Sequence, residues 1–561
     1  MPRKIATVDC ETDPFRKGRV QIAPFLWGLY DGEFYHEFED ILDLVAYLED
    51  KPLIVYAHNG GKFDWHFIIS LIEPFTELMI INGRLSKFRI GKCEFRDSFN
   101  ILPVALSAYQ KTEINYDIME KEERHKPENW QVIRDYLRDD CVFLYDLVSQ
   151  FIDQYGINLT LAGSAMKQWE KISGLKPPKD EDGQLYEKFK PFYHGGRCQA
   201  FSYGVIESDF SMVDINSAYP FAMLHNHPYG IGYIELNHGD WLALDQPEQG
   251  TCLLSVVAES GGGLPYKGSD GSLYFPDDYK SRTYCCSGWE LIAAIDTGTI
   301  RNWHIEEAFY FPDQVDFRDY INEFYSKRQE IKEKGKDIDK EDKANSIFYK
   351  LLMNSLYGKF GSNPHNYANY QNAPPEFIND NGEIIIENDD GLEQAWSFNG
   401  DFGNYALITK DLEEDEQRFY NIATAASITG YVRAYMWRAL CQCTGLLYCD
   451  TDSIAAHSIG TLPGGYGTDL GQWEKEGDFD HGAVCGKKLY AFHKKDTGWK
   501  SRKNYKVASK GVKLTPNKIY RIAKGESVTF TPKGVSFSVH RPPAQISRTI
   551  SMTKKVLPEN E

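Results

Sequence analysis

Short apolar runs alternate with helical patterns along the first part of the chain. Residues 1–155 contain the strand-like segments KIATVDCET, PLIVYAHN and CEFRDSFN, and helical spacing follows from about residue 128 to residue 152. Short apolar runs bounded by turn residues predict strands, and alternation of strands with helices is typical of α/β domains. The pattern therefore predicts an α/β domain over residues 1–155.

The long helical segment places one carboxylate among its apolar residues. On a helical wheel, Ile133, Leu137 and Leu144 form one stripe, Asp140 falls in the middle of it, and Tyr136 borders it. The neighbouring acids of this segment lie on the opposite face. An ionised carboxylate on a buried stripe is costly unless something positive neutralises it. We therefore expect Asp140 to face a cation.

The pattern changes several times after residue 155. A polar stretch rich in proline and lysine near residues 175–184 is typical of a linker. Glycine, proline and aspartate turns separate short strands from residue 225 to 312, whereas residues 316–358 are highly charged and helical in spacing. With 561 residues the chain is too long for one ordinary core. The sequence therefore predicts a multidomain protein with α/β and α+β parts.

Composition and charge narrow the classes of function. No apolar run reaches about 18 residues, so no membrane partner is expected, and the 11 cysteines show no C-x-x-C spacing that would indicate a zinc site. The net charge is −19, yet residues 482–561 carry 18 lysines and arginines against 4 acids. A basic C-terminal segment on an acidic body indicates a grip on a polyanion beside metal-dependent sites. A basic surface without a partner remains the alternative.

A first set of carboxylates lies near the N-terminus. Asp9 and Glu11 are two positions apart on a predicted strand and point to one face, and Asp64 follows a strand and a Gly-Gly turn. Together with Asp140, four acids from three segments could hold two divalent cations that activate a water against a phosphodiester. The D-x-E spacing by itself is typical of ordinary surface acids, so the placement of Asp140 carries this interpretation.

A second set centres on the segment YCDTDSI. Asp450 and Asp452 stand one residue apart between apolar strand formers, and Asp214 ends another apolar strand. If these strands are neighbours, Asp214 and Asp452 can hold two Mg²⁺ ions that bind a triphosphate and activate a 3′-hydroxyl, with Asp450 supporting the site. A polar hairpin tip is the alternative.

The segment KLLMNSLYGKFG carries a polar helical face. Lys350, Asn354 and Tyr357 lie at positions i, i+4 and i+7 of a predicted helix. A lysine there can meet triphosphate oxygens, and a tyrosine can stack on a base. Taken alone, this face could also be simply solvated.

The N-terminal acids resemble a known enzyme family. The pattern D-x-E, N-x3-F-D and Y-x3-D is that of DEDD-type 3′–5′ proofreading exonucleases. The resemblance implies that Asp9, Glu11, Asp64 and Asp140 bind metal and that Tyr136 orients the attacking water. It further implies a catalytic-site lysine and ligands of the frayed single strand, which are Lys111, Thr12, Asn59, Phe63, Ser98 and Phe99.

The later motifs resemble those of family B DNA polymerases. DINSAYP, K-LLM-NS-L-YG and YCDTDS are similar to motifs A, B and C, with Ala218 where the family has leucine; TGYVR is similar to T-x-x-(G/A)-R, with Val432 departing. The resemblance implies that Tyr219 stacks on the sugar and rejects ribonucleotides, that Lys350 binds triphosphate, and that Tyr357 and Asn354 check the nascent pair. The implied DNA contacts are Tyr193, Gly195, Gly196, Arg433, Lys488 and Tyr490.

Two insertions indicate a subfamily. The exonuclease motif begins at residue 9, and segments of about 225–315 and 362–403 interrupt the polymerase motifs. This resembles the protein-primed polymerases of linear-genome phages, most closely the tectiviral type. The resemblance implies an RNase H-like exonuclease domain and a palm-fingers-thumb polymerase domain with two terminal-protein-region insertions. The first insertion would contact the priming protein, and the second would encircle template and aid strand displacement.

The resemblance also sets domain borders and partners. It implies an exonuclease domain at 1–155, a linker region with the Y-x-G-G element at 156–195, a palm at 196–225 and 404–481, a first insertion at 226–315, fingers at 316–361, a second insertion at 362–403 and a thumb at 482–561. It implies two Mg²⁺ ions per active site, with Mn²⁺ able to substitute. The implied partners are primer-template DNA, dNTPs and a terminal protein that supplies the priming hydroxyl. A monomer in the cytoplasm of an infected bacterial cell is expected.

Three other functions are weighed against this one. A stand-alone exonuclease with an inactive polymerase half is disfavoured by the intact motifs A, B and C. A reverse transcriptase would carry a Y-x-D-D hairpin and no editing site. A non-catalytic DNA-binding replication factor would need no arrangement of carboxylates at two sites, and a metal-dependent incorporation assay separates it from an enzyme.

Overall fold

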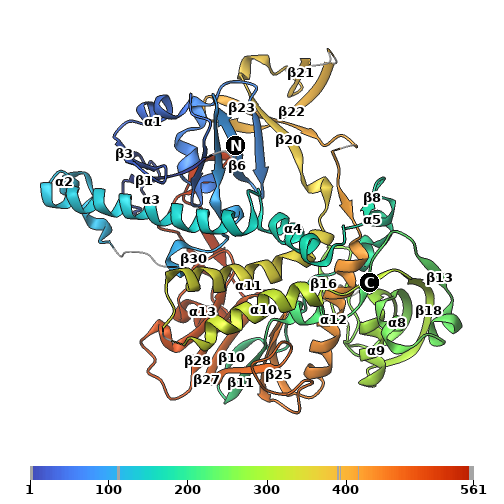
Figure 1. Cartoon of the computed structure of the whole chain (residues 1–561). Helices are drawn as coiled ribbons and strands as arrows, with labels where there is room; N and C mark the ends of the chain where they lie inside the picture. The colour runs from blue at the N-terminus through green and yellow to red at the C-terminus, as the bar shows by residue number, and fades with distance from the viewer. Residues whose placement is uncertain are drawn as a thin grey trace.

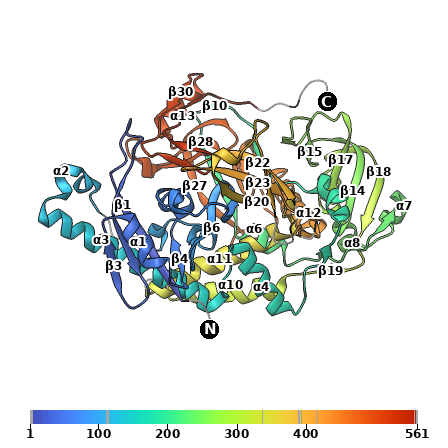
Figure 2. The same ribbon diagram turned by 90° about the horizontal axis from the view of Figure 1, so that it is seen from above.

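The computed structural model describes residues 4–109, 114–335, 337–387, 391, 393–414, 416–554 and 557. The N-terminal domain, drawn in blue, lies above the long helices α10 (Arg318–Glu333) and α11 (Lys340–Phe360), and the palm strands lie below them (Figure 1). The first insertion lies at the opposite end of the molecule from helix α2 (Lys121–Arg124) in both views (Figures 1 and 2).

The N-terminal domain is built on a mixed sheet covered by one long helix. Strand β1 (Ile5–Thr12) pairs in parallel with β4 (Ile54–Ala57), which pairs in parallel with β7 (Cys93–Asp97). Helix α3 (Pro127–Tyr155) packs against β1 and buries the predicted apolar stripe. It begins with proline, whose fixed φ suits the first helical turn, and ends before Gly156 at a φ of 75°. The α/β prediction for this region is confirmed.

The second insertion is joined to the edge of this same sheet. Strand β20 (Ala368–Ala373) pairs with β5 (Glu77–Ile81), and Tyr370 lies opposite Leu78. The resulting sheet of eleven strands runs in the order β21-β22-β23-β20-β5-β6-β7-β4-β1-β2-β3. Its remaining strands are β2 (Pro24–Tyr30), β3 (Tyr35–Phe38), β6 (Arg84–Ile90), β21 (Glu383–Glu387), β22 (Glu393–Phe402) and β23 (Tyr405–Asp411). The expected end of the insertion at 403 is too early, because β23 continues the sheet to Asp411.

A second large sheet forms the palm. Its strands run in the order β29-β28-β27-β11-β26-β25-β9, with β10 also paired to β27. The strands are β9 (Cys198–Ala200), β10 (Gly204–Ile206), β11 (Phe210–Ile215), β25 (Thr444–Asp450), β26 (Ser453–Ser458), β27 (Trp473–Gly486), β28 (Leu489–Lys494) and β29 (Tyr505–Ser509). The expected border between palm and thumb at 481/482 is wrong, because β27 crosses it and β28 and β29 continue the same sheet. The residues after Ser509 leave this sheet but pack against it, because Leu514 and Ile519 share one apolar core with Ala483 and Ala491.

Helices join the palm to the fingers. Helices α10 and α11 pack on each other and on α4 (Leu161–Ser173), and α11 also packs on α12 (Ile422–Leu440). Phe348, Leu352 and Leu356 of α11 are fully buried, as expected for the apolar side of an amphipathic helix. The helical prediction for residues 316–358 is confirmed, with a break between the two helices.

The first insertion has its own small core. Its sheet runs β13-β18-β14-β17, formed by β13 (Ile234–Leu236), β14 (Leu253–Ser260), β17 (Ser281–Ser287) and β18 (Ile300–Tyr310). Helix α9 (Gly288–Asp296) of the insertion packs against α12 of the palm.

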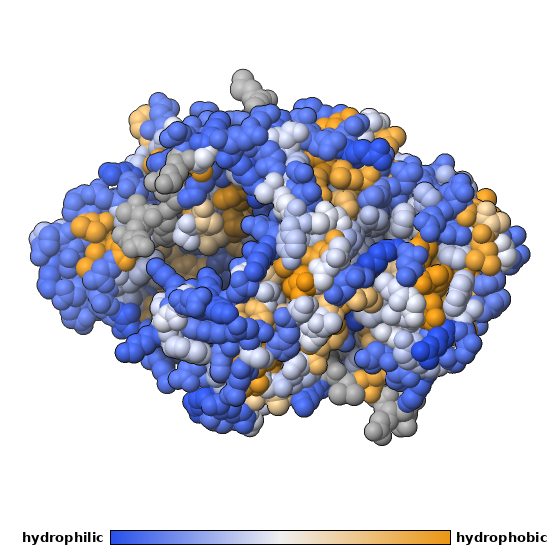
Figure 3. Space-filling view, turned by 90° about the horizontal axis from the view of Figure 1, so that it is seen from below, coloured by the Kyte–Doolittle hydropathy of each residue, from blue (hydrophilic) through white to orange (hydrophobic). Residues whose placement is uncertain are grey.

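The face of the molecule seen in Figure 3 is mostly hydrophilic and is hollowed at one place, with apolar residues in its depth. No helix among the described residues is long and apolar enough to cross a membrane.

Candidate active sites

The palm sheet brings the two expected polymerase acids together. Strands β11 and β26 are antiparallel neighbours, with Asp214 opposite Ser453, and the Ile215 N–H donates to the Asp452 carbonyl oxygen at 2.8 Å. The predicted adjacency of these strands is confirmed. Thr451, at the tip between the two acids of the hairpin, has a φ of 60°. This left-handed residue turns the chain so that Asp452 follows Asp450 across the tip.

The environment of these acids favours a cation. Burial, followed by the charge of Asp452, raises the pKa of Asp214 to about 7. Burial, followed by the charge of Asp450, raises the pKa of Asp452 to about 6. Both pKa values are also raised by Glu476 of β27, which the sequence analysis missed although it lies in the acidic run WEKE. Acids that repel one another in a partly buried place fit a divalent cation with oxygen ligands.

No three acidic, histidine or cysteine side chains of the described residues already stand in a metal-binding arrangement. Mg²⁺ at phosphoryl-transfer sites is usually bound by one or two carboxylates, and waters and substrate phosphates complete its ligands. Asp214 and Asp452 offer such a pair of oxygen donors, so the residues present fit the implied ion.

In metal-free buffer, Asp214→Asn should raise the melting temperature by about 2 °C or more at pH 8 and by less at pH 5. The folded protein binds the Asp214 proton more tightly than the unfolded chain, because the folded pKa is near 7. As the pH rises from the unfolded pKa to the folded pKa, the unfolded chain releases this proton while the folded protein retains it, so the free energy of unfolding falls. Asparagine has no such proton and avoids the fall. Thermal melts with EDTA at both pH values check this. An equal rise at both would contradict it.

Asp450 is neutralised by a lysine of the neighbouring strand turn. The Lys488 Nζ donates to both carboxylate oxygens of Asp450 at 2.8 Å, and the Lys488 backbone N–H donates to the Tyr448 hydroxyl at 2.8 Å. Asp450 is therefore held in an ion pair next to Asp452. Lys488, which the sequence analysis expected at the primer end, is bound to Asp450 in this structure. Tyr490 is only 5% exposed, and its ring centroid lies 4.8 Å from that of Tyr448.

Two tyrosines form one wall beside the acids. The rings of Tyr219, on α6 (Ala218–Ala222), and Tyr357, on α11, stack at 4.3 Å and 15°. One turn earlier on α11, the Asn354 Nδ2 donates to the Lys350 carbonyl oxygen at 2.7 Å, and the Lys350 side chain is exposed. The predicted helical face therefore exists, with Tyr357 turned toward motif A.

Two further cations of α10 face the exposed lysine of α11. Burial, followed by the charges of Arg328 and Lys350, lowers the pKa of Lys332. The sequence analysis missed Arg328 and Lys332. They lie four positions apart in the helix before motif B, a spacing that puts both side chains on one face. The three cations together make a place suited to a triphosphate.

Arg433, expected to contact DNA, is turned inward. It is 2% exposed, its Nε lies 2.7 Å from Glu290 Oε1, and its Nη1 donates to the carbonyl oxygens of His194 and Gly195 at 2.6 and 2.9 Å. The expected direct DNA contact is therefore not available, because the guanidinium is buried in an ion pair with the first insertion. Of the Y-x-G-G element, Gly195 is exposed and Tyr193 is half-buried.

Three of the four expected exonuclease acids line a cavity at the junction of β1 and α3. A cavity of about 340 Å³ is lined by Asp9, Glu11, Tyr136 and Asp140, with Thr12 and Phe63 at its wall. Asp140 and Glu11 are 4% and 6% exposed, so two carboxylates are buried close to the same space. Burial raises the pKa of Tyr136. The wheel prediction for Asp140 is confirmed as to its place on the buried stripe.

Asp64 lies immediately behind this cavity. It is 2% exposed, and the Cys10 Sγ donates to its Oδ1 at 3.2 Å. Burial raises the pKa of Asp64, and the charges of Asp64 and Asp9 raise that of the Cys10 thiol after burial itself. The thiol thus connects Asp64 to the D-x-E strand, and carboxylate oxygens are the type of ligand that divalent cations prefer.

The expected ligands of a frayed strand differ in exposure. Phe63 lies in the cavity wall and meets Phe15 and Phe537 at centroid distances of 5.7 and 5.4 Å. Asn59 accepts a hydrogen bond from Arg84 at 2.8 Å, and the same guanidinium lies 4.5 Å from the centre of the Phe99 ring. Asn59 and Phe99 are thus connected through Arg84, whereas Phe63 lies at the cavity.

Ser98 is a correction to the expected set. It is fully buried, its hydroxyl donates to the Ala57 carbonyl oxygen at 3.2 Å, and it lies 3.0 Å from His58 Nδ1. It therefore orders the strand ends and does not reach a DNA strand. The expected catalytic lysine, Lys111, lies outside the described residues.

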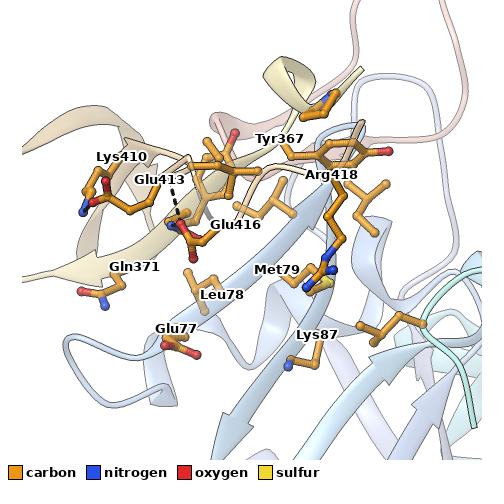
Figure 4. A pocket seen from close by; sticks show the side chains of 18 of the residues that line it. Glu77, Leu78, Met79, Lys87, Tyr367, Gln371, Lys410, Glu413, Glu416 and Arg418 are labelled. Atoms are coloured by element: carbon orange, nitrogen blue, oxygen red, sulfur yellow. Dashed lines mark hydrogen bonds and ion pairs between the residues drawn. The ribbon is translucent and has the colours of Figure 1, made fainter. Parts of the chain in front are cut away.

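A larger cavity lies where the second insertion joins the exonuclease sheet. It measures about 980 Å³ and is bounded by β5 and β6 on one side and by β20 to β23 on the other. Lys87 and Arg418 extend toward it from different segments, while Lys410 and Glu413 form an ion pair at its rim (Figure 4). The cavity thus carries both signs of charge.

The chain is similar to known DNA polymerases along most of its length. A family model described as DNA polymerase type B, organellar and viral, matches residues 106–436. A DNA-directed DNA polymerase of Enterobacteria phage PRD1 is 38% identical over 526 residues, covering 92% of this chain and 87% of the relative. A DNA polymerase of Kluyveromyces lactis is 23% identical over an alignment that covers 81% of this chain and 52% of the relative.

Solved structures share the same fold. Phi29 DNA polymerase complexed with primer-template DNA and incoming nucleotide substrates has a TM-score of 0.70 at 19% identity, covering 99% of this chain and all of that one. The same polymerase complexed with single-stranded DNA has a TM-score of 0.70 at 18% identity. At this identity the likeness establishes the arrangement of domains and leaves the chemistry to the residues described above.

Proposed function

The chain belongs to the organellar and viral type B DNA polymerases and is a DNA-directed DNA polymerase of the phage type; we propose that it starts replication from a protein primer and edits its product with a 3′–5′ exonuclease. The observation that carries the polymerase site is that Asp214 of β11 lies beside the hairpin turn that holds Asp452, with the stacked tyrosines nearby. Its place of action would be the cytoplasm of an infected bacterial cell.

Each residue of the polymerase site has a task that its position supports. Asp214 and Asp452 would hold two Mg²⁺ ions, or Mn²⁺ in their place, and these ions supply charge stabilisation and an activated 3′-hydroxyl. Lys350, with the cations of α10, would bind the triphosphate, and Tyr357 with Asn354 would contact the nascent pair. Lys488 and Tyr490 would hold the primer end.

The exonuclease is proposed on three acids that line one cavity, Asp9, Glu11 and Asp140, with Asp64 connected to their strand through Cys10. Asp9, Glu11, Asp64 and Asp140 would bind the metals, while Tyr136 would orient the attacking water toward a phosphodiester. Phe63 and Thr12, which line the cavity, would bind the frayed strand together with Asn59 and Phe99. The task of Lys111 remains a prediction from the resemblance.

The two insertions are assigned to partners. The first would contact a terminal protein that offers the priming hydroxyl. The second would guide the template, and the cavity of about 980 Å³ where it joins the exonuclease sheet supports this assignment (Figure 4). Lysine and arginine side chains there can meet phosphates, although the nearby glutamates limit the net positive charge.

One pair of assays tests the proposal. The purified chain should extend a primed template with dNTPs and Mg²⁺ and should stop when EDTA is added. With a candidate terminal protein, one labelled dNTP and Mg²⁺, a labelled protein–nucleotide adduct should form without any DNA primer. Extension without adduct formation across candidate terminal proteins would reject protein priming and keep the polymerase.

Tyr219→Val should weaken discrimination against ribonucleotides by about 10-fold or more. The ring of Tyr219 lies shortly after Asp214 and is fixed by its stack on Tyr357, so it would block a 2′-hydroxyl on the incoming sugar. The measurement is kcat/KM for dNTP and rNTP on one primed template. Tyr349→Val, on the same helix as Tyr357 but packed on Phe324, is the control. An unchanged ratio for Tyr219→Val would place the gate elsewhere.

A further inference from the structure

The tip of the catalytic hairpin is held by the Y-x-G-G segment. The Thr451 N–H donates to the Arg197 carbonyl oxygen at 2.6 Å. Gly196 lies so close that a Cβ there would be 2.8 Å from both Cγ2 and Oγ1 of Thr451. Thr451 adopts a left-handed φ of 60° between the two acids of motif C. The backbone of Gly196 and Arg197 therefore sets the conformation from which Asp450 and Asp452 project.

The side chain of Arg197 leads from this tip into the interior. It is 2% exposed, and its Nη1 donates to the Gly262 carbonyl oxygen at 2.8 Å, while its Nη2 donates to Gln199 Oε1 at 2.6 Å. The guanidinium carbon lies 4.2 Å from the centre of the Phe275 ring and 4.6 Å from that of Trp437. The cation is thus clamped between one ring of the first insertion and one ring of palm helix α12.

This is an unusual place for a charge. Burial lowers the pKa of Arg197 to about 10, so the guanidinium still carries its charge at neutral pH. No carboxylate forms an ion pair with it in the part of the chain that the structure describes. Desolvation of a cation is costly, and hydrogen bonds to neutral oxygens with cation–π contacts offset only part of that cost. An apolar side chain would fill the space at lower cost, but could not bind the Gly262 carbonyl oxygen.

The other end of the connection belongs to the first insertion. Gly262 follows strand β14, and its N–H is 3.2 Å from the Ser260 hydroxyl oxygen. Trp437 is held to the same insertion, because its Nε1 donates to the hydroxyls of Thr297 and Thr299 at 3.1 and 3.0 Å. A displacement of the Gly262 loop therefore reaches motif C through one side chain.

We propose that Arg197 is a positioning residue of the nucleotidyl-transfer site, anchored by its guanidinium to the first insertion and holding the Thr451 tip with its carbonyl oxygen. The inference rests on the proposed polymerase site. It adds a mechanical connection by which the first insertion, the segment assigned to the priming protein, controls the geometry of Asp450 and Asp452. The exonuclease acids lie in another domain and are not touched by it.

The primary test replaces the guanidinium. Arg197→Met should lower kcat for primer extension by about 10- to 100-fold and raise the Mg²⁺ concentration for half-maximal extension by at least about 3-fold, while KM for DNA changes little. Arg197→Lys keeps the charge but lacks the fork that reaches both Gly262 and Gln199, so it should recover activity only in part. Exonuclease activity of the same preparations should keep its rate and its Mg²⁺ dependence.

A matched control is another buried arginine of the first insertion. Arg282 is 8% exposed and stands opposite Ala258 on the strand next to β14, but its guanidinium pairs with Asp278 at 2.6 Å and donates to the Lys280 carbonyl oxygen. Arg282→Met should leave the Mg²⁺ dependence of extension unchanged. The same shift in Arg282→Met, or a parallel loss of extension and exonuclease activity in Arg197→Met, would overturn the inference, because Arg197 would then only stabilise the fold.

A second pair of variants tests the tip without touching the guanidinium. Gly196→Ala should lower kcat for extension, because its Cβ would press on the Thr451 side chain. Adding Thr451→Gly should restore most of that loss, since glycine removes the contact and accepts the left-handed φ. Normal extension by Gly196→Ala would overturn the inference. Absence of extension by the unaltered chain would instead reject the proposed function, so the two failures are distinguishable.

Discussion

Asp452→Ala should lower nucleotide incorporation on primed DNA by about 10³-fold or more and leave degradation of single strands intact. Asp452 lies in the turn before β26, whose first residue, Ser453, is paired with Asp214 of β11. Burial is the first cause of the raised pKa of both acids, followed by the charge of Asp452 for Asp214 and by the charge of Asp450 for Asp452. Alanine removes half of the oxygen pair that would hold the metals and leaves the residues proposed to contact DNA unchanged. Single-turnover extension and exonuclease assays on one preparation measure both effects.

An acid on the neighbouring strand gives a control of equal charge. Asp478 of β27 is bound by Lys475 at 2.8 Å and by the Ser211 hydroxyl at 2.6 Å, and these contacts lower its pKa. Asp478→Ala should leave the rate of incorporation within about 2-fold, as expected for an exposed ion pair. Retention of incorporation by Asp452→Ala at more than a tenth of the normal rate would remove that carboxylate from the reacting centre.

The double replacement of Asp9 and Glu11 by alanine should have the opposite effect. Degradation of single strands should fall by about 10³-fold or more, while extension of a matched primer stays within about 2-fold. Both side chains line the cavity that Asp140 and Tyr136 complete, in a domain separate from the palm sheet. Misincorporated ends should therefore persist, which sequencing of the products measures.

Asp139→Ala is the matched control on the helix that carries Asp140. Asp139 projects to the solvated face of α3, where its side chain is 55% exposed next to Arg138. It should retain full exonuclease activity. If the Asp9 and Glu11 variant also lost extension while its melting temperature stayed normal, the assignment of the two activities to separate domains would be wrong.

Local spacing predicted the parts of the structure that depend on neighbours in the sequence. The 3.6-residue period put Asp140 on the apolar stripe of α3, and the structure buries it to 4% exposure. The same reasoning put Tyr357 on one face of α11. The alternation of a strand was enough to orient Asp9 and Glu11 to one side. In each case the side chain direction follows from the backbone of a single element.

Contacts between distant segments could not be predicted in this way. Arg433 and Ser98 belong to motifs that were expected to contact DNA. Both are buried instead, where Arg433 pairs with Glu290 and the Ser98 hydroxyl lies within hydrogen-bond distance of His58. The borders at 403 and 481 failed for a related reason: β23 and β27 continue sheets whose partner strands are remote in the chain. A strand's ladder partners depend on packing of whole layers, which a local pattern does not contain.

By itself, the sequence determined which residues carry charge, which elements present them, and which chemistry those residue types favour. Only the tertiary structure decided which of them meet. It placed Asp214 beside Asp452, paired Asp450 with Lys488 in a salt bridge, and buried Arg197 between the catalytic hairpin and the first insertion. The physical reason is that burial and long-range pairing set the electrostatic environment of a side chain, and both come from segments far apart in the chain.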